Sequence, residues 1–337
     1  MEHKRFKRNL RSETERISTL VVRYLHPKSS VAFWHTDINA VFYPPESFAD
    51  YYIDFTSKLT YRGPTDLNGL PKLDYFGNVG ARYNPVAIGQ YALGAWSRYR
   101  RGGEGAEAGR AMFSSAASWL AENLEIDGAG RGYWFYRFRA DGYGLNGAPE
   151  VPPWASGLAQ SMGISALIRA WVGGFKNEGR ELARAAAKGM LTDVADGGLC
   201  RRFDGNLVIE EGVVERPQAI LDGALFAIFG LHDYCILEKG DRQAQDALRE
   251  AVDSIARLLP EYNLKAWSRA DLYNIDPPMP ASWFYHQLHV HQLRIMYGLF
   301  GIPVFLEYAN RWQRDFDSVP RRYSALVRKA MFKLRRY

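Results

Sequence analysis

The sequence lacks the features that identify several large classes of protein. It has 337 residues but only two cysteines, Cys200 and Cys235, so neither a disulfide framework nor a CxxC metal pair can be drawn, and we expect two buried thiols. It contains no P-loop, no nucleotide-type glycine fingerprint and no HExxH motif. No apolar run is long enough for a signal peptide or a membrane span. We therefore expect a protein that is cytoplasmic or peripheral to the membrane and needs no cofactor.

Acidic residues are scarce at both ends of the chain. Residues 1–11 hold five Lys/Arg and one Glu, and residues 318–337 hold seven Lys/Arg and no acid, so the body between them carries a net charge of −5 although the whole chain carries +6. The basic charge thus belongs to the tails, and nucleic-acid binding is not expected. The C-terminal tail mixes Leu and Val with cations, which is typical of a basic amphipathic helix. Such a helix could contact an anionic membrane surface, pack on the body or remain in solvent.

Apolar residues are abundant and follow a helical period. The chain is 47% hydrophobic, which is enough for a large core. Helical stripes cover residues 112–124, 221–235 and 248–259, and further helices are predicted near 85–99, 154–172, 178–191, 284–299 and 303–316. Two glycine turns, at 127–130 and 196–198, each lead into a predicted hairpin, the second one covering residues 199–209. Repeated helix pairs of this kind predict a mainly α fold, an incomplete α/α toroid with short β-hairpins.

The N-terminal part has a different composition. Residues 26–84 are rich in Tyr, Phe, Pro, Asp and Gly, which predicts short strands and irregular loops rather than a separate domain. We divide the chain into a basic extension at residues 1–39, a toroid domain at 40–317, and a basic tail or helix at 318–337.

Four stretches place polar side chains inside apolar helical runs. They are Tyr83–Tyr91, Trp154–Gln160, Glu215–Gly223 and Trp283–Leu293. Buried Gln, Tyr and His need hydrogen-bond partners, so these stretches form either a shared polar pocket or separate core hydrogen bonds. His286, His289 and His291 have no further ligand at a familiar spacing, and we predict no metal site.

The same stretches resemble the C-terminal helical domain of the D-glucuronyl C5-epimerases, which act on heparosan-type glycosaminoglycans. The likeness lies in Tyr-x-Pro-x-x-x-x-Gln-Tyr, Trp-x-Ser-x-x-Ala-Gln, Glu-x-Pro followed by Leu-x-Gly, and Tyr-His-x-x-His-x-x-Gln-Leu, in this order, within residues 40–315. The resemblance implies a polysaccharide uronate C5-epimerase with an acidic polysaccharide as substrate. It also implies catalytic roles for Glu215 and Tyr285 on opposite faces of the sugar. Substrate contacts are then expected from Tyr83, Gln90, Trp154, Gln160, Arg216, Arg269, His286 and His289.

The sequence departs from the family pattern at three points. Arg216 stands where the family has a tyrosine after the glutamate, and Ala270 stands where it has the tyrosine of Tyr-Asp-Leu. Arg216 and Arg269 are then candidates to clamp a carboxylate. The β-sandwich domain of the animal members has no place in residues 26–124.

Three other functions fit the same residues. A polysaccharide lyase would share the first step, proton abstraction at C5. A glycoside hydrolase would use a carboxylate pair drawn from Glu211, Glu215 and Asp222. A non-catalytic exopolysaccharide-binding protein would need no acid or base. The sequence leaves the polymer and the oligomeric state open.

Overall fold

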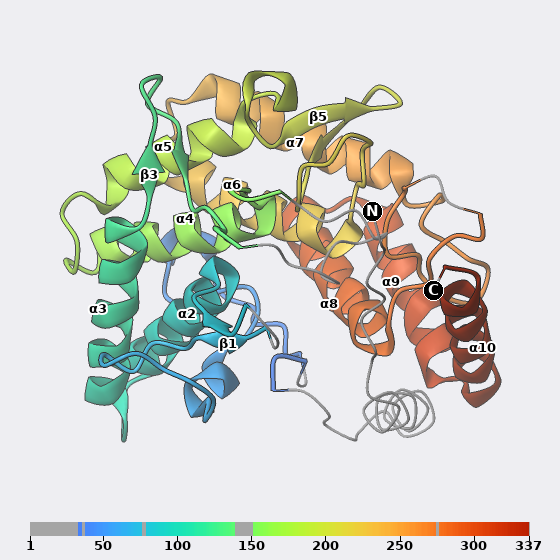
Figure 1. Cartoon of the computed structure of the whole chain (residues 1–337), viewed down its shortest axis with the longest axis horizontal. Coiled ribbons are helices and arrows are strands. Elements are labelled where there is room, and N and C mark those ends of the chain that lie inside the picture. The colour runs from blue at the N-terminus through green and yellow to red at the C-terminus, as the bar shows by residue number, and fades with distance from the viewer. Residues whose placement is uncertain (1–32, 36–37, 76–78, 139–150, 274–275, 337) are drawn as a thin grey trace, which may run out of the picture.

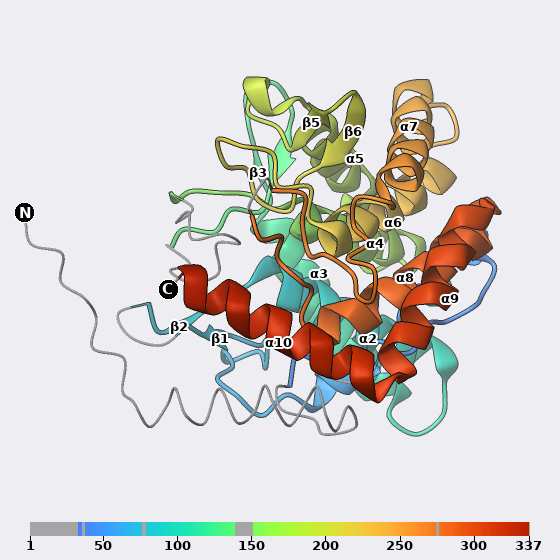
Figure 2. The same ribbon diagram turned by 90° about the vertical axis from the view of Figure 1, so that its right-hand side faces the viewer.

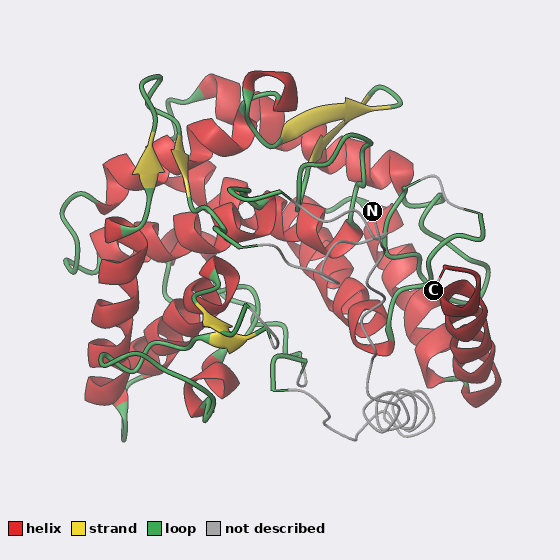
Figure 3. Cartoon of the chain, in the orientation of Figure 1, coloured by secondary structure: helices red, strands yellow, loops and turns green. Residues whose placement is uncertain are grey.

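A computed structural model of the chain describes residues 33–35, 38–75, 79–138, 151–273 and 276–336. Within these residues helices dominate, and the strands form only short antiparallel pairs (Figure 3). The α-helices are α2 (Pro85–Arg101), α3 (Ala106–Glu122), α4 (Gly157–Val172), α5 (Gly179–Leu191), α6 (Leu221–Leu237), α7 (Arg242–Leu258), α8 (Trp283–Phe300), α9 (Pro303–Asp317) and α10 (Val319–Arg336). The strand pairs are β1 (Leu73–Asp74) with β2 (Ala81–Arg82), β3 (Glu125–Ile126) with β4 (Gly132–Tyr133), and β5 (Cys200–Phe203) with β6 (Asn206–Ile209). Short 3-10 helices are η1 (Pro45–Ser47), η2 (Thr56–Thr60) and η4 (Val194–Asp196).

The long helices form consecutive pairs, α2 with α3, α4 with α5, α6 with α7 and α8 with α9. The first members also contact one another in the order α2, α4, α6, α8, and so form an inner row with their partners outside. Figure 1 shows these pairs following an arc that does not close. The predicted incomplete α/α toroid is therefore confirmed.

The inner helices α4 and α6 are buried on nearly all sides. Close approach between them requires a residue without a side chain at one crossing point. A Cβ atom on Gly230 of α6 would lie 2.5 Å from the Cα atom of Ser161 in α4. The contact explains why the apolar stripe predicted for residues 221–235 contains a glycine, although glycine lowers helix propensity.

Side-chain caps fix where three of the inner helices begin. Asn84, Ser156 and Ser282 precede α2, α4 and α8, and each side-chain oxygen accepts a backbone N–H from the first helical turn. Pro85 and Pro303 occupy the first position of α2 and α9, where a missing N–H costs nothing. The caps thus fix the helix starts in three of the four predicted polar stretches, while α6, in the fourth, begins without a side-chain cap.

The shorter predicted elements are also present. The hairpin predicted before residue 209 forms as β5 and β6 around Asp204 and Gly205, while the earlier one is reduced to the two-residue strands β3 and β4. Residues 38–75 hold 3-10 helices and isolated bridges, as expected for an irregular segment, and residues 1–32 lie outside the described part. Both cysteines are free and buried. Among the described residues, no helix combines the length and apolarity that crossing a bilayer requires.

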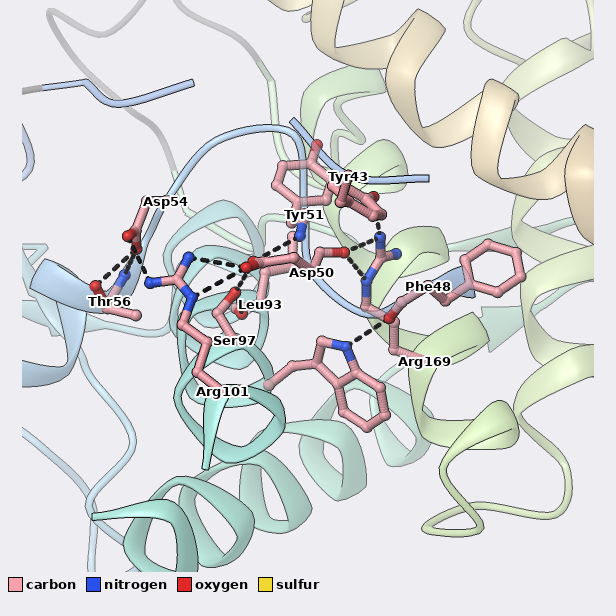
Figure 4. A network of polar contacts seen from close by, with 11 residues as sticks. Tyr43, Phe48, Asp50, Tyr51, Asp54, Thr56, Leu93, Ser97, Arg101 and Arg169 are labelled. Atoms are coloured by element: carbon pink, nitrogen blue, oxygen red, sulfur yellow. Dashed lines mark hydrogen bonds and ion pairs between the residues drawn. The ribbon is translucent and has the colours of Figure 1, made fainter. Parts of the chain in front are cut away.

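A buried polar network holds residues 43–56 against the inner helices (Figure 4). Arg169 of α4, fully buried, donates hydrogen bonds to the Asp50 carbonyl (2.6 Å) and to the Asp233 carboxylate of α6 (2.6 Å). Arg101 of α2 donates to the carboxylates of Asp50 (2.9 Å) and Asp54 (2.8 Å). The irregular segment is thus fixed by charged groups of three helices. Residues 53–58, at the end of this segment, contribute to the wall of the cavity described below.

Candidate active site

A cavity lies where the N-terminal ends of the inner helices converge. Its walls come from the first turns of α2, α6 and α8, from the start of α4, and from residues 53–58 of the N-terminal segment. The polar and aromatic lining residues include Trp34, His35, Asp54, Lys58, Tyr75, Asn84, Gln90, Tyr136, Trp154, Glu211, Asp222 and Tyr285. Helix N-termini carry partial positive charge, so four of them directed at one cavity favour an anionic ligand.

Tyr285 stands at the start of α8 and is half-buried in the cavity wall. Its ring meets the His35 ring edge-on, with the centroids 5.6 Å apart, and the neighbouring Phe284 ring stacks on His35 at 4.5 Å. The cap Ser282 accepts a hydrogen bond from the backbone N–H of Tyr285. The phenol is therefore held on a rigid helix start, as a precisely positioned acid/base group requires.

Glu211 reaches the cavity from the loop that follows β6. Its side chain rests against the first turn of α6, because a Cβ atom on Gly223 would lie 2.5 Å from the Glu211 Oε2 atom. The preceding residue, Glu210, is buried and accepts hydrogen bonds from the backbone N–H groups of Gln218 and Ala219, both at 3.1 Å. Burial raises the pKa of Glu210. Glu210 thus fixes the loop, and Glu211 is the member of the pair that lines the cavity.

Asp222, the second cavity carboxylate of this region, is backed by a chain of buried polar groups. The His289 Nε2 atom lies 3.7 Å from Asp222 Oδ1, and the Ser268 hydroxyl lies 2.9 Å from His289 Nδ1 and 2.8 Å from His286 Nδ1. His286 Nδ1 accepts the Ser268 backbone N–H, so its Nε2 atom carries the proton that is donated to the Trp312 carbonyl at 3.0 Å. Burial, followed by the proximity of His289, holds the pKa of His286 well below its usual range, so this ring is neutral.

Lys58, from the N-terminal segment, contributes a cationic group to the cavity wall. It is buried, and its ammonium group donates to the carbonyl oxygens of Phe33 and Trp34, both at 3.2 Å, while lying over their two rings. Burial lowers its pKa to about 8. Among the described residues that line the cavity, it is the one Lys or Arg side chain.

An aromatic group forms another part of the wall. The rings of Tyr136 and Trp154 stack with centroids 3.9 Å apart, and the Trp154 indole donates to the Phe138 carbonyl. The Tyr136 hydroxyl donates to the Asn84 side chain (3.1 Å), which in turn donates to the Tyr75 hydroxyl (2.6 Å). Flat aromatic rings beside hydrogen-bonding groups suit the alternating apolar faces and hydroxyl groups of a sugar chain.

The structure brings only some of the residues predicted from sequence into this cavity. Tyr285, Gln90 and Trp154 line it. His286 and His289 lie buried behind Asp222, and Gln160 is a core residue that bonds the Gly132 and Ala186 carbonyls. The two possibilities for the polar stretches, a pocket and core hydrogen bonding, therefore both occur.

The remaining predicted residues lie elsewhere. Glu215 and Arg216 are exposed in the loop before α6, outside the residues that line the cavity. Arg269 donates to the Tyr273 carbonyl, and it too is outside the lining. The Tyr83 hydroxyl donates to Asp66 at 2.7 Å, and burial, together with that bond, raises the pKa of Tyr83 to about 12.

The histidines of α8 are not arranged as metal ligands among the described residues. Both ring nitrogens of His286 are engaged by protein groups. No group of three or more potential metal ligands occurs within the ranges that the structure describes. The absence of a metal and of a cofactor from the reaction stays a prediction.

Sequence reasoning missed several cavity residues. Lys58, Tyr75 and Tyr136 lie in aperiodic segments, where no pattern indicates which side chain faces inward. For Asp222 a signal was present, because an acidic residue inside an apolar helical run needs a partner or a function. In the sequence, Glu211 and Asp222 are predicted only as carboxylates of the glycoside hydrolase alternative.

The fold and the cavity together define a helical-toroid protein with a pocket lined by carboxylates, a phenol, aromatic rings and one lysine. Comparison with known proteins makes this specific. The family model described as D-glucuronyl C5-epimerase C-terminus matches residues 128–314, more than half of the chain. The chain therefore belongs to the D-glucuronyl C5-epimerase family.

Two known proteins give the extent of the likeness. The D-glucuronyl C5-epimerase of Caenorhabditis elegans is 29% identical over 214 residues, which cover 59% of this chain and 34% of that protein. The present chain thus spans about a third of the length of that relative. The structure is also similar to that of cellobiose 2-epimerase from Spirochaeta thermophila, with a TM-score of 0.48 and 14% identity over 90% of this chain and 85% of that one.

Proposed function

We propose that this protein epimerises uronate residues of an acidic, heparosan-type polysaccharide at C5, converting D-glucuronate to L-iduronate. The observation that carries the proposal is the joint placement of Tyr285, Glu211 and Lys58 around one cavity in a member of this family. The uronate substrate is proposed from the activity for which the Caenorhabditis elegans relative is named. The cavity supplies what the reaction needs, namely acid/base groups, a cation and aromatic surfaces.

The reaction exchanges one proton. A base removes the C5 proton, and the electron pair of the C–H bond moves into the adjacent carboxylate as an enolate. An acid then delivers a proton to C5 from the opposite face, and the pair returns to form the new C–H bond. The C5 proton is very weakly acidic, so the enolate needs positive charge beside the carboxylate. Lys58 and the converging helix N-termini are the groups in place for that role.

Tyr285 and Glu211 are our candidates for the two acid/base groups. They come from different elements, α8 and the β6–α6 loop, and both line the cavity. The resemblance in sequence favours Glu215 instead, and that residue remains the alternative. We prefer Glu211 because Glu215 is exposed and lies outside the lining, whereas an acid/base group must reach hydrogen-bonding distance of the sugar.

Asp222 is placed to assist Glu211. Asp222 lies in the first turn of α6, against which Glu211 rests. The Asp222 carbonyl accepts a hydrogen bond from the Gln292 amide at 2.9 Å, and His289 Nε2 lies 3.7 Å from Asp222 Oδ1. We propose that Asp222 binds sugar hydroxyl groups, while the buried histidine and serine chain behind it keeps its position.

The test is NMR of heparosan incubated with the protein in deuterium oxide. The proposal predicts deuterium at C5 and the appearance of iduronate signals without shortening of the chain. Heparosan that is unchanged in both respects, alongside a correctly folded protein, would count against it.

The same experiment separates the lyase alternative. A lyase shares the enolate intermediate but expels the 4-O-linked sugar, so it leaves unsaturated chain ends and shorter chains. A glycoside hydrolase leaves new reducing ends without unsaturation.

A further inference from the structure

Helix α10 packs only one of its faces on the rest of the protein. Ala325 and Phe332 are buried on that face, and Phe332 joins a small cluster with Met279 and Ala281. Lys329 donates to the Pro280 carbonyl from the same side. Figure 2 shows α10 lying along the outside of the described fold. The helix follows residue 314, where the match to the family model ends.

The outer face carries an exposed apolar row. Val319, Tyr323, Val327 and Met331 have exposed fractions of 56%, 58%, 40% and 47%. They are spaced four residues apart, so they lie on one side of the helix. Four neighbouring apolar side chains on one helix face are a patch rather than scattered exposure, and such patches mark interaction surfaces.

A row of arginines runs beside the apolar row. Arg321, Arg328 and Arg335 are exposed and seven residues apart, so they also share one side of the helix. Residues 319–336 contain seven Lys/Arg and no Asp or Glu. Arg321 pairs with Asp315, and Arg328 donates to the Leu264 carbonyl, so Arg335 is the member for which no such intramolecular bond is described.

We propose that the outer face of α10 docks the protein on an anionic lipid bilayer. A basic edge beside an apolar row matches the two chemistries of the membrane interface, where cations meet lipid phosphates and apolar side chains enter the acyl boundary. A soluble polyanionic sugar would use the arginines but would give Val327 and Met331 nothing to contact. The inference is independent of the activity proposed above.

Sedimentation with vesicles tests the proposal on the full chain. The vesicles are phosphatidylglycerol mixed with phosphatidylcholine, with pure phosphatidylcholine as the neutral comparison. The apolar variant is Tyr323→Ser/Val327→Ser/Met331→Ser, and the basic variant is Arg328→Gln/Arg335→Gln. A control, Arg110→Gln/Arg249→Gln, removes the same charge from exposed sites on α3 and α7. Thermal unfolding followed by circular dichroism checks that each variant is folded.

The wild type and the control should bind the anionic vesicles and not the neutral ones. The basic variant should bind about fivefold more weakly for each arginine removed, the factor that corresponds to about 1 kcal/mol per basic side chain at an anionic surface. The apolar variant should lose affinity by on the order of a hundredfold. The proposal is overturned if the wild type does not bind anionic vesicles, or if both outer-face variants bind as the wild type does. It is also overturned if these variants lose binding to soluble heparosan while vesicle binding is unchanged.

Discussion

Lys58 is a lysine in a position where few lysines are found. Its buried ammonium group lies over the rings of Phe33 and Trp34 in the cavity wall, and burial lowers its pKa to about 8. The side chain is an ammonium ion below that pH and a neutral amine above it. Under the proposed function, this ammonium group would clamp the uronate carboxylate in neutral solution, and the clamp would be lost as the pH rises through about 8.

This gives a prediction for the pH profile. In the wild type, kcat/KM should fall as the pH rises through about 8, and Lys58→Met should lack this limb. At neutral pH the variant should be about tenfold to a hundredfold slower, since hydrogen bonds to charged groups contribute about 1.5–3 kcal/mol. The measurement is the rate of C5 deuterium exchange over the pH range. Lys239→Met, at an exposed position, is the control and should keep the wild-type profile. A Lys58→Met enzyme with an unchanged limb would rule out this role.

Gly223 provides a second prediction at this scale. A methyl group there would lie 2.5 Å from Glu211 Oε2 and 2.7 Å from Glu211 Cβ, so Gly223→Ala must move the carboxylate. We expect kcat to fall by on the order of a hundredfold, because a displacement of about 1 Å is enough for a loss of that size. Gly298→Ala is the matched helical control, since its new methyl group would meet only a Phe42 ring atom at 3.8 Å. Equal activity of the two variants would show that Glu211 is not the reacting group.

At the scale of the elements, the sequence is informative where a period exists. The stripe Leu248, Val252, Ile255 identifies α7, because burial of one face repeats every 3.6 residues. The loop from Ile209 to Leu221 has no such repeat. Hydrogen bonds to the Glu210 carboxylate and the close contact between Glu211 and Gly223 hold this loop so that Glu211, and not Glu215, lines the cavity. These contacts join residues that no local sequence pattern relates.

The buried ion pair between α4 and α6 carries a prediction about stability. Arg169→Met leaves the Asp233 carboxylate buried without its guanidinium partner, so the free energy of unfolding should drop by about 3–5 kcal/mol. Arg180→Met removes a half-exposed arginine, and its partner Glu238 still pairs with Arg184 at 3.1 Å. This variant should lower the free energy of unfolding by about 1 kcal/mol or less. Urea denaturation measures both. Similar losses in the two variants would mean that the Arg169 network does not anchor residues 43–56.

At the scale of the whole molecule, the cavity is a property of the toroid rather than of any one motif. Each inner helix contributes its first turn or its cap, and residues 53–58 close the site from a distant part of the sequence. The sequence leaves open whether the four polar stretches share a pocket or form separate core hydrogen bonds. Consecutive helix pairs bring like helix ends to the same side, and so bring the four stretches to one end of the toroid. Which of their side chains face the cavity depends on packing between helices. Of the residues that the family resemblance predicts for the site, Tyr285, Gln90 and Trp154 line the cavity.

The most direct test of the central claim is the rate of deuterium incorporation at C5 of heparosan, compared among the wild type, Tyr285→Phe, Glu211→Gln and Glu215→Gln. We predict that Tyr285→Phe and Glu211→Gln each lose about 10²–10⁴-fold in rate, the usual contribution of a positioned acid or base, while Glu215→Gln stays close to the wild type. Loss of exchange in Glu215→Gln, with full activity in Glu211→Gln, would contradict the account.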